Sequence, residues 1–415
     1  MNSKAIFGVL DQALQSLINF SVGLFFINYS TKIVFGYYSL AYATILLVIG
    51  FSNAIVNTQM TVRAHNLKGE EFDRFCGYMF LQLVFGSALV FLLFFLVGIF
   101  VYQFLSSDFG LYISIIGFAI PGYVILEFTR RYYYLKNLSR MVLTMDIVYI
   151  IILCVVGIPS FIYIDYQLHY AYFFLTGLLA LFVSLWFLLR NDIVININLN
   201  SMYHAVKESW SGGVWSSLGI ITTWGQAQGY TIIISGTLGA QALAELNAAR
   251  ILFAPVMLLS TGIMKVYMPD FSKHYIHGYV DKLVLQARYV LIIVLSLSAI
   301  YIVFILSYYD GISNIVFSSE YQGIKYLVGF WAVYYLVLAL RTNKSVLMQV
   351  FRKFKQITMI GFFVTPLIII FSLLSTYIIG LEGVLVSMIM GELLFAYILN
   401  HKLLTIRKEL LCYKI

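Results

Sequence analysis

Residues 10–20 read LDQALQSLINF, inside an otherwise apolar segment that runs from about Ala5 to Ile27. At 100° per residue, the small and polar positions of this segment fall within roughly 140° of arc and form a single stripe. The stripe comprises Gly8, Asp11, Gln12, Gln15, Ser16, Asn19 and Gly23. The other positions are mostly Leu, Ile, Phe and Val. A helix of this length can cross a bilayer, and we expect its polar stripe to face a water-filled space.

The composition of the whole chain indicates that its solvent is a bilayer. The 415 residues are 61% apolar and only 11% charged, and the mean hydropathy is +0.91. A soluble protein would carry about twice that charged fraction. The three cysteines, Cys76, Cys154 and Cys412, fit no metal or disulfide pattern. We therefore expect an all-α polytopic membrane protein that needs no metal or cofactor.

The hydropathy pattern predicts 12 transmembrane helices, because about 20 apolar residues are needed for each crossing. The expected segments are 6–28, 37–58, 77–104, 109–130, 141–163, 168–189, 212–235, 240–264, 284–307, 323–343, 357–379 and 381–401.

Basic residues predict the orientation of these segments. Of the 26 lysines and arginines, 23 precede the first segment or follow an even-numbered one. The opposite loops hold only Lys32 and Lys325, and Arg250 lies inside a segment. The positive-inside rule then places both termini in the cytoplasm. The formal net charge of +8 follows from this topology and requires no nucleic-acid partner.

A weak internal echo suggests two parallel bundles of six helices each. Gly36 opens the second segment and Gly239 the eighth, while Arg130 ends the fourth and Arg341 the tenth. An even number of segments in each half makes the halves parallel repeats. We expect an N-terminal bundle at 1–190, a cytoplasmic linker at 191–211, a C-terminal bundle at 212–403 and a cytoplasmic tail at 404–415.

The chain lacks the motifs of a membrane enzyme. It contains neither G-x-x-x-x-G-K nor H-E-x-x-H, and His274 and His277 are interpreted as part of a solvated loop. No long external loop is expected that would hold catalytic groups, which argues against a membrane-embedded glycan polymerase or ligase. We expect no enzyme and no catalytic residue.

Arg250 is the most informative single residue. It lies about ten residues into the eighth segment, where a guanidinium costs several kcal/mol unless it is paired or hydrated. It is interpreted as an anion site in a cavity, the alternative being an ion pair with Glu245 or with an acid on another helix. Arg341 is a second candidate, unless it snorkels to the interface. Arg130 and Arg131 are interpreted as interface anchors.

Other polar groups lie inside the expected segments. Gln226 and Trp224 belong to the seventh segment, where Gly and Ser favour helix packing and the glutamines favour a cavity lining. Asp146 lies in the fifth segment, and Glu127 is interpreted as a helical partner of Arg130 or Arg131.

The sequence resembles Wzx-type polysaccharide flippases, which belong to the MATE-like multidrug/oligosaccharidyl-lipid/polysaccharide exporter superfamily. Five stretches carry the resemblance, which extends over almost the whole chain. They are the first-segment pattern D-Q-x-x-x-S-x-x-N-F at 11–20, FGYYSLA at 35–41, EFTRR at 127–131, W-x-x-G-x-W at 210–215 and G-x-x-G at 236–239 with Pro255 and Pro269.

The resemblance implies a V-shaped pair of bundles that works by alternating access. The cargo would be an undecaprenyl-pyrophosphate-linked oligosaccharide, moved from the cytoplasmic to the periplasmic leaflet of a bacterial inner membrane for O-antigen, lipopolysaccharide or capsule synthesis. Arg250 and Arg341 would then contact pyrophosphate. The glycan would contact Gln12, Gln15, Asn19, Gln226 and Trp224.

Coupling to H⁺ or Na⁺ would involve Asp11 and Asp146. A glycan polymerase and a chain-length regulator are the expected protein partners. The leading alternative is a MATE-type drug/cation antiporter with the same fold, which an acidic cavity without a deep arginine would favour.

Overall fold

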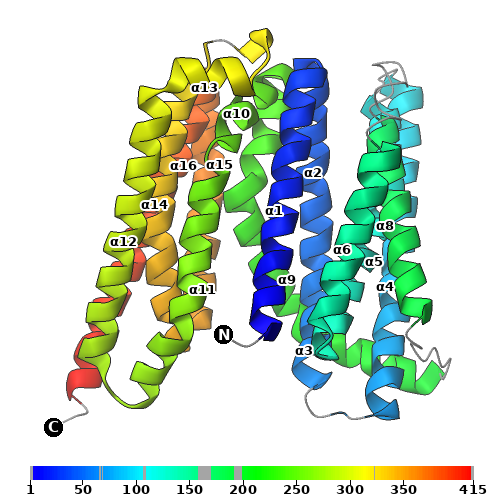
Figure 1. Cartoon of the computed structure of the whole chain (residues 1–415), viewed down its shortest axis with the longest axis horizontal. Coiled ribbons are helices and arrows are strands. Elements are labelled where there is room, and N and C mark those ends of the chain that lie inside the picture. The colour runs from blue at the N-terminus through cyan, green and yellow to red at the C-terminus, as the bar shows by residue number, and fades with distance from the viewer. Residues whose placement is uncertain are drawn as a thin grey trace. The chain divides into compact units, whose positions relative to one another are not determined.

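The computed structural model describes residues 3–64, 67, 69–105, 109–157, 170–190, 199–321 and 323–412 (Figure 1). Across these ranges the regular structure is helical, without a strand. This all-α architecture confirms the fold class that the composition predicts.

The chain divides into two compact units, and each unit is built from two separate stretches of the chain. Unit 1 comprises Met1–Asn19 and Ala41–Ile221, and unit 2 comprises Phe20–Leu40 and Thr222–Ile415. Three helices therefore contribute to both units: α1 (Ser3–Tyr29), α2 (Lys32–Ser52) and α9 (Leu199–Thr237).

Unit 1 is completed by helices between α2 and α9. These are η1 (Asn53–Asn57, a π-helical turn), α3 (Thr58–Ala64), α4 (Glu70–Leu105), α5 (Phe109–Leu135), α6 (Ser139–Ile152), η2 (Leu153–Gly157, also π-helical) and α8 (Tyr170–Arg190). Helices α5 and α8 pack with their backbones in contact at Gly122 and Gly177. A Cβ on Gly122 would lie only 1.9 Å from the carbonyl oxygen of Gly177. Small residues at such contacts are typical of helix pairs in membranes.

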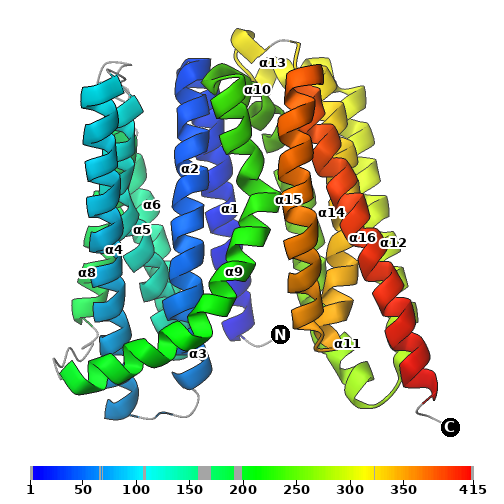
Figure 2. The ribbon, with the colours of Figure 1, turned by 180° about the vertical axis from the view of Figure 1, so that it is seen from behind.

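Unit 2 is completed by the helices that follow α9 (Figure 2). These are α10 (Ala240–Ile251), α11 (Ala254–Ile276), α12 (Val280–Ser307), α13 (Tyr309–Val316), η3 (Ser319–Tyr321, a 3₁₀ turn), α14 (Lys325–Val350), α15 (Phe354–Ile379) and α16 (Leu381–Cys412). Helices α10 and α11 meet at a bend of 53°. The carbonyl of Leu252 at this break accepts a hydrogen bond of 2.8 Å from the Tyr301 hydroxyl, which replaces a lost helical bond.

The corner between α1 and α2 packs onto unit 2. Lys32 Nζ lies 2.6 Å from Glu245 Oε1, and a Cβ on Gly36 would lie 1.9 Å from the carbonyl oxygen of Ala240. Asn28 Nδ2 donates to the carbonyl of Val316 at 2.9 Å. These contacts explain why Phe20–Leu40 belongs to unit 2.

Within the described residues, seven helices are long and apolar enough to cross a membrane, or eight if α10 and α11 form one broken span. Each of the twelve segments expected from hydropathy coincides with a helix or a broken helix wherever the structure describes it. The protein is a polytopic membrane protein. The count of twelve crossings and the cytoplasmic position of both termini remain predictions.

The expected linker and tail are only partly described. Residues 191–198 and 413–415 lie outside the described residues, whereas residues 199–211 form the first turns of α9 and residues 404–412 the last turns of α16. The domain boundaries expected at 190, 212 and 403 remain predictions.

Candidate functional site

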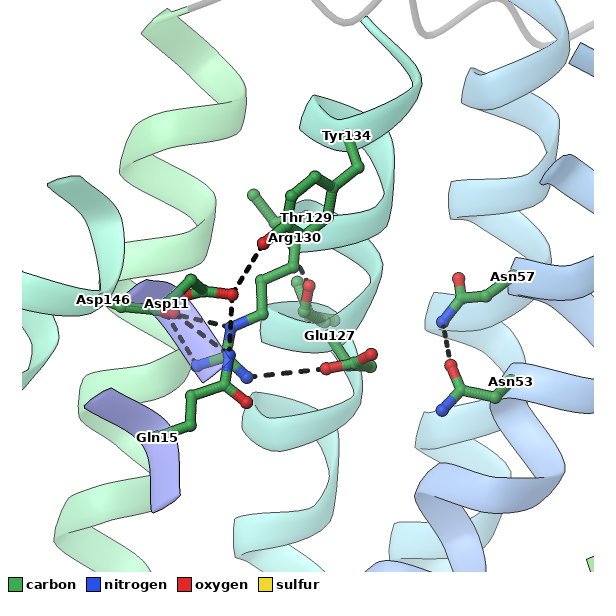
Figure 3. A network of polar contacts seen from close by, with 10 residues as sticks. Asp11, Gln15, Asn53, Asn57, Glu127, Thr129, Arg130, Tyr134 and Asp146 are labelled. Carbon is green, nitrogen blue, oxygen red and sulfur yellow. Dashed lines mark hydrogen bonds and ion pairs between the residues drawn. The ribbon is translucent and has the colours of Figure 1, made fainter. Parts of the chain in front are cut away.

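The first cluster of membrane-embedded polar groups belongs to unit 1 and joins α1, α5 and α6 (Figure 3). Arg130 donates from Nε and Nη2 to Asp146 Oδ1, at 2.9 and 2.7 Å. The Tyr134 hydroxyl donates to Asp11 Oδ2 at 2.7 Å. Gln15 Nε2 donates to both carboxylates, at 3.1 Å to Asp11 Oδ2 and 3.3 Å to Asp146 Oδ2. One glutamine therefore connects two acids that are far apart in sequence.

Helical spacing brings these side chains to one place. Asp11 and Gln15 are four residues apart on α1, and Arg130 and Tyr134 are four apart on α5, so each pair occupies one helix face. Asp146 is only 1% exposed and Asp11 only 4%. Buried charges of this kind persist where they are paired and hydrogen-bonded.

The charges of this cluster do not cancel. Glu127 Oε2 lies 3.5 Å from Arg130 Nη1, so two carboxylates contact the guanidinium, and Asp11 adds a third through Gln15 and Tyr134. Among the described residues, Asp11 Oδ1 is buried without a hydrogen-bond partner. Acids that share one cation in a low-dielectric site are neutralised by binding a proton or a small cation. The cluster is therefore chemically suited to cation uptake.

Helix α5 also packs against the π-helical turn η1. Asn57 Nδ2 donates to Asn53 Oδ1 at 2.7 Å, and the two side chains appear in Figure 3. Asn57 is fully buried, and its Oδ1 has no hydrogen-bond partner in the described part of the chain. Single π-helical turns inside α-helices are frequent at functional sites. Asn53 and Asn57 are not among the site residues predicted from the sequence, although two asparagines four residues apart in an apolar segment are a visible signal.

The second cluster surrounds Arg250 in unit 2. Arg250 lies in the last turn of α10, directly before the break that separates α10 from α11. Its Nη1 donates to Gln228 Oε1 at 3.3 Å and to the Tyr230 hydroxyl. Tyr230 in turn donates to Asn247 Oδ1 at 2.6 Å. The guanidinium carbon also lies 5.8 Å from the centre of the Tyr230 ring.

Glu245, one of the partners considered for Arg250, pairs with Lys32 at 2.6 Å. Five residues of helical spacing direct Glu245 and Arg250 to different faces of α10. A pair between Arg250 and an acid on another helix remains an alternative prediction. Gln228 and Tyr230 are uncharged acceptors, and their hydrogen bonds orient the Arg250 guanidinium.

The third cluster joins four helices of unit 2, namely α9, α14, α15 and α16. Arg341 Nη1 lies 2.9 Å from Glu392 Oε1 and 2.7 Å from Gln226 Oε1. Gln226 Nε2 donates to Thr365 Oγ1 at 2.8 Å. Glu392 is 2% exposed and Gln226 4%. Arg341 is therefore held inside the bundle by an ion pair and does not snorkel to its end.

Comparison with known proteins identifies the fold. No family model and no curated protein matches the chain. A structure described as the inward-facing conformation of a multidrug resistance MATE family transporter of the MOP superfamily matches with a TM-score of 0.72 and 15% identity, covering 96% of this chain and 95% of that chain. The chain has the MATE fold.

Two further structures share this fold. Lipid II flippase MurJ, in an inward closed conformation, matches the chain with a TM-score of 0.74 and 13% identity, covering 96% of this chain and 87% of MurJ. A MOP superfamily transporter from Pyrococcus furiosus, whose description reports a binding pocket of reverse polarity, has a TM-score of 0.63 and 15% identity over 99% of this chain and 95% of that chain. At these identities the likeness establishes the architecture alone.

The MATE-fold units divide the residues that the sequence singled out. Asp11, Gln15 and Asp146 meet in unit 1, whereas Gln226 meets Arg341 in unit 2. Asn19 is exposed and Trp224 half-buried. The side chain of Gln12 lies outside the described residues. That all of them line one cavity remains a prediction.

The role predicted for Arg130 is wrong, and two residues of the clusters were not predicted from the sequence. Arg130 is not an interface anchor, because its side chain is only 16% exposed and is paired with Asp146. Tyr134 and Glu392 were not selected as site residues. The sequence did contain one signal for a buried role of Arg130. Arg130 and Arg341 occupy equivalent positions, because each ends the fourth segment of a predicted half.

The two units of the MATE fold contain matching polar groups. In each unit, a glutamine from the first helix of a predicted half, an arginine from its fourth helix and a buried carboxylate form one hydrogen-bonded group. The members are Gln15, Arg130 and Asp146 in unit 1, and Gln226, Arg341 and Glu392 in unit 2. The two groups share their composition, but the carboxylates come from different positions in the predicted halves, the fifth segment for Asp146 and the twelfth for Glu392.

Proposed function

We propose that the protein is a Wzx-type flippase that moves an undecaprenyl-pyrophosphate-linked oligosaccharide between the leaflets of a bacterial inner membrane. Transport runs from the cytoplasmic to the periplasmic side by alternating access, and it supplies the synthesis of a surface polysaccharide. The sequence resemblance supports the substrate class. The MATE fold supports transport, because it is shared with structures described as a multidrug transporter and as a lipid II flippase.

The observation that carries this proposal is the position of Arg250. A guanidinium beside a break in a membrane helix is costly, and such breaks are typical of substrate sites in transporters. Gln228 and Tyr230 accept hydrogen bonds from Arg250 and orient its guanidinium. The pyrophosphate of a lipid carrier supplies the matching negative charge, and the planar guanidinium binds phosphate oxygens in a bidentate manner.

Coupling is assigned to the cluster in unit 1. Asp11 and Asp146 share Gln15 as a donor, while Arg130 supplies the one positive charge. Binding of H⁺ or Na⁺ would remove part of the negative surplus and thereby stabilise one conformation over another. An acid cluster of this kind also suits a MATE-type drug/cation antiporter, so that function is the second candidate.

The test is transport by the purified chain in proteoliposomes. A fluorescent pyrophosphate-linked oligosaccharide is incorporated, and its appearance in the second leaflet is followed by an impermeant quencher. We expect Arg250→Ala to lower the initial rate about 30-fold or more, since a hydrogen bond to a charged group contributes roughly 2 kcal/mol. Arg250→Lys should recover only part of the rate, because a point charge lacks the guanidinium fork.

Arg288→Ala is the matched control, because Arg288 is an exposed arginine on α12 of the same unit. An Arg250→Ala rate equal to that of Arg288→Ala, at equal protein incorporation, would contradict the anion role of Arg250. Wild-type transport of cationic dyes without any movement of the lipid-linked oligosaccharide would favour the drug/cation antiporter.

A further inference from the structure

The ion pair between Arg341 and Glu392 uses one guanidinium nitrogen and one of the two carboxylate oxygens. The single contact joins Arg341 Nη1 to Glu392 Oε1 at 2.9 Å. Within the described ranges, Arg341 Nε and Glu392 Oε2 are both buried without a hydrogen-bond partner. An arginine and a carboxylate at their strongest form two parallel bonds. This pair therefore leaves the Nε donor of Arg341 and the Oε2 acceptor of Glu392 unused in a place where water does not reach them.

For a buried ion pair, Arg341 and Glu392 stabilise each other only weakly. Removing two charges from water is offset only when the geometry is good and the remaining donors and acceptors are satisfied. Here neither condition is met fully, since Glu392 is 2% exposed and one of its oxygens is unpartnered. A ligand that offers Arg341 a second and third acceptor oxygen would bind the guanidinium better than Glu392 does.

The surroundings hold Arg341 in place independently of Glu392. Gln226 Oε1 on α9 accepts from Arg341 Nη1 at 2.7 Å, and Gln226 is itself fixed by Thr365 of α15 at 2.8 Å. On α16, the ring of Phe395 lies 4.7 Å from the guanidinium carbon. The Arg341 side chain retains 19% exposure, so one part of it is open to a ligand. The guanidinium can thus exchange one anion for another without losing its position.

We propose that Glu392 is a built-in counter-anion that competes with the anionic group of the cargo for Arg341. This inference rests on the proposed function and specifies how the same transporter selects and releases its cargo. A pyrophosphate displaces the single Glu392 oxygen, whereas a neutral or cationic molecule does not. When the cargo leaves, Glu392 pairs with Arg341 again, so the emptied site does not retain a bare charge.

The experiment measures binding of a soluble probe, farnesyl pyrophosphate, to the detergent-solubilised full chain by titration calorimetry, with farnesol as the uncharged reference. Glu392→Gln removes the competing charge and should tighten the Kd for farnesyl pyrophosphate about tenfold, as expected when a ligand no longer competes for a mostly occupied group. Arg341→Gln should weaken binding. The double variant should match Arg341→Gln, because the competition requires both residues.

Glu245→Gln is the matched control, since it removes the acid of another ion pair in unit 2, the one with Lys32, and should leave the Kd unchanged. Tightening in Glu392→Gln should be accompanied by a lower turnover number in proteoliposomes, because release slows. A purely structural ion pair would instead lower the melting temperature of Glu392→Gln and leave its Kd unchanged or weaker, which would overturn the inference.

A second variant, Glu392→Asp, tests the same inference if Glu392→Gln accumulates poorly in the membrane. Glu392→Asp keeps the charge but shortens the side chain, so it should loosen the pair and tighten the Kd about threefold. An unchanged Kd in Glu392→Asp would also overturn the inference. If the wild-type chain does not bind farnesyl pyrophosphate at all, the proposed function itself fails. If it binds and the Glu392 variants behave as wild type, only the counter-anion role fails.

Discussion

Replacing the two aspartates of unit 1 one at a time should have unequal effects on stability. Asp146→Asn removes the negative charge at the acceptor of two Arg130 bonds, at 2.7 and 2.9 Å, and leaves without this counter-ion a guanidinium whose side chain is only 16% exposed. Removing one partner of a buried pair typically costs 3–5 kcal/mol. Since Glu127 lies 3.5 Å from Arg130 and compensates in part, we expect a loss of about 3 kcal/mol.

Asp11→Asn should be much milder. Asn keeps an acceptor for the Tyr134 hydroxyl, which donates to Asp11 at 2.7 Å, and the substitution removes one of the surplus negative charges. We expect a change within about 1 kcal/mol. Glu127→Gln is the matched control, because its ion pair is long and partly exposed, and it should stay within about 1 kcal/mol.

The assay is unfolding of each purified variant by titration with sodium dodecyl sulfate, with free energies compared at one detergent concentration. A loss in Asp11→Asn as large as that in Asp146→Asn would refute the assignment of Asp146 as the counter-ion of Arg130. Under the proposed coupling role, Asp11→Asn should in addition fold normally but lose the stimulation of transport by an imposed ion gradient.

Two other predictions concern the architecture. Cytoplasm-active and periplasm-active reporters, fused after four positions in turn, should report in, out, in and out. The positions are Lys136, Ile164, Tyr275 and Gly311. The same compartment at two consecutive positions would contradict the twelve-span topology. Gly36→Ala should cost about 2 kcal/mol or more through its clash with the Ala240 carbonyl, measured by detergent unfolding. Gly86→Ala, which meets no atom within 4 Å, should be neutral or stabilising.

The sequence predicts the helices well because each one must satisfy its own backbone in lipid. The segment expected at 357–379, for example, coincides with α15 at Phe354–Ile379. The same local pattern also predicts that Asp11 and Gln15 share a helix face, and they are hydrogen-bonded at 3.1 Å. Periodicity of 3.6 residues determines both features without knowledge of the neighbouring helices.

Contacts between helices could not be predicted in the same way. Periodicity shows which residues share one face of a helix, but it does not show which other helix packs against that face. Asp146 was visible as a membrane-embedded acid, but its partner Arg130 lies on another helix. Arg341 was visible as a membrane-embedded base, but its partner Glu392 lies on another helix. Arg130 was misassigned because a basic residue near a predicted helix end usually anchors at the interface. Here α5 continues to Leu135, so Arg130 lies a full turn inside the helix.

The division into units was also beyond sequence reasoning. A boundary drawn along the chain assigns every residue before it to one half, whereas Phe20–Leu40 belongs to unit 2. The close approach of Gly36 to Ala240 and the ion pair between Lys32 and Glu245 stabilise this arrangement. Both contacts join residues about 200 positions apart and leave no periodic signal in the sequence.

The measurement that tests the central claim most directly compares two lipids with the wild-type chain. Both carry the same fluorescent oligosaccharide and the same undecaprenyl tail, but one is joined through pyrophosphate and the other through an uncharged linker. Proteoliposomes containing the protein should move the pyrophosphate-linked lipid between leaflets and leave the uncharged one at the rate of protein-free vesicles. Equal movement of both lipids would contradict an anion-recognising flippase with Arg250 at its site.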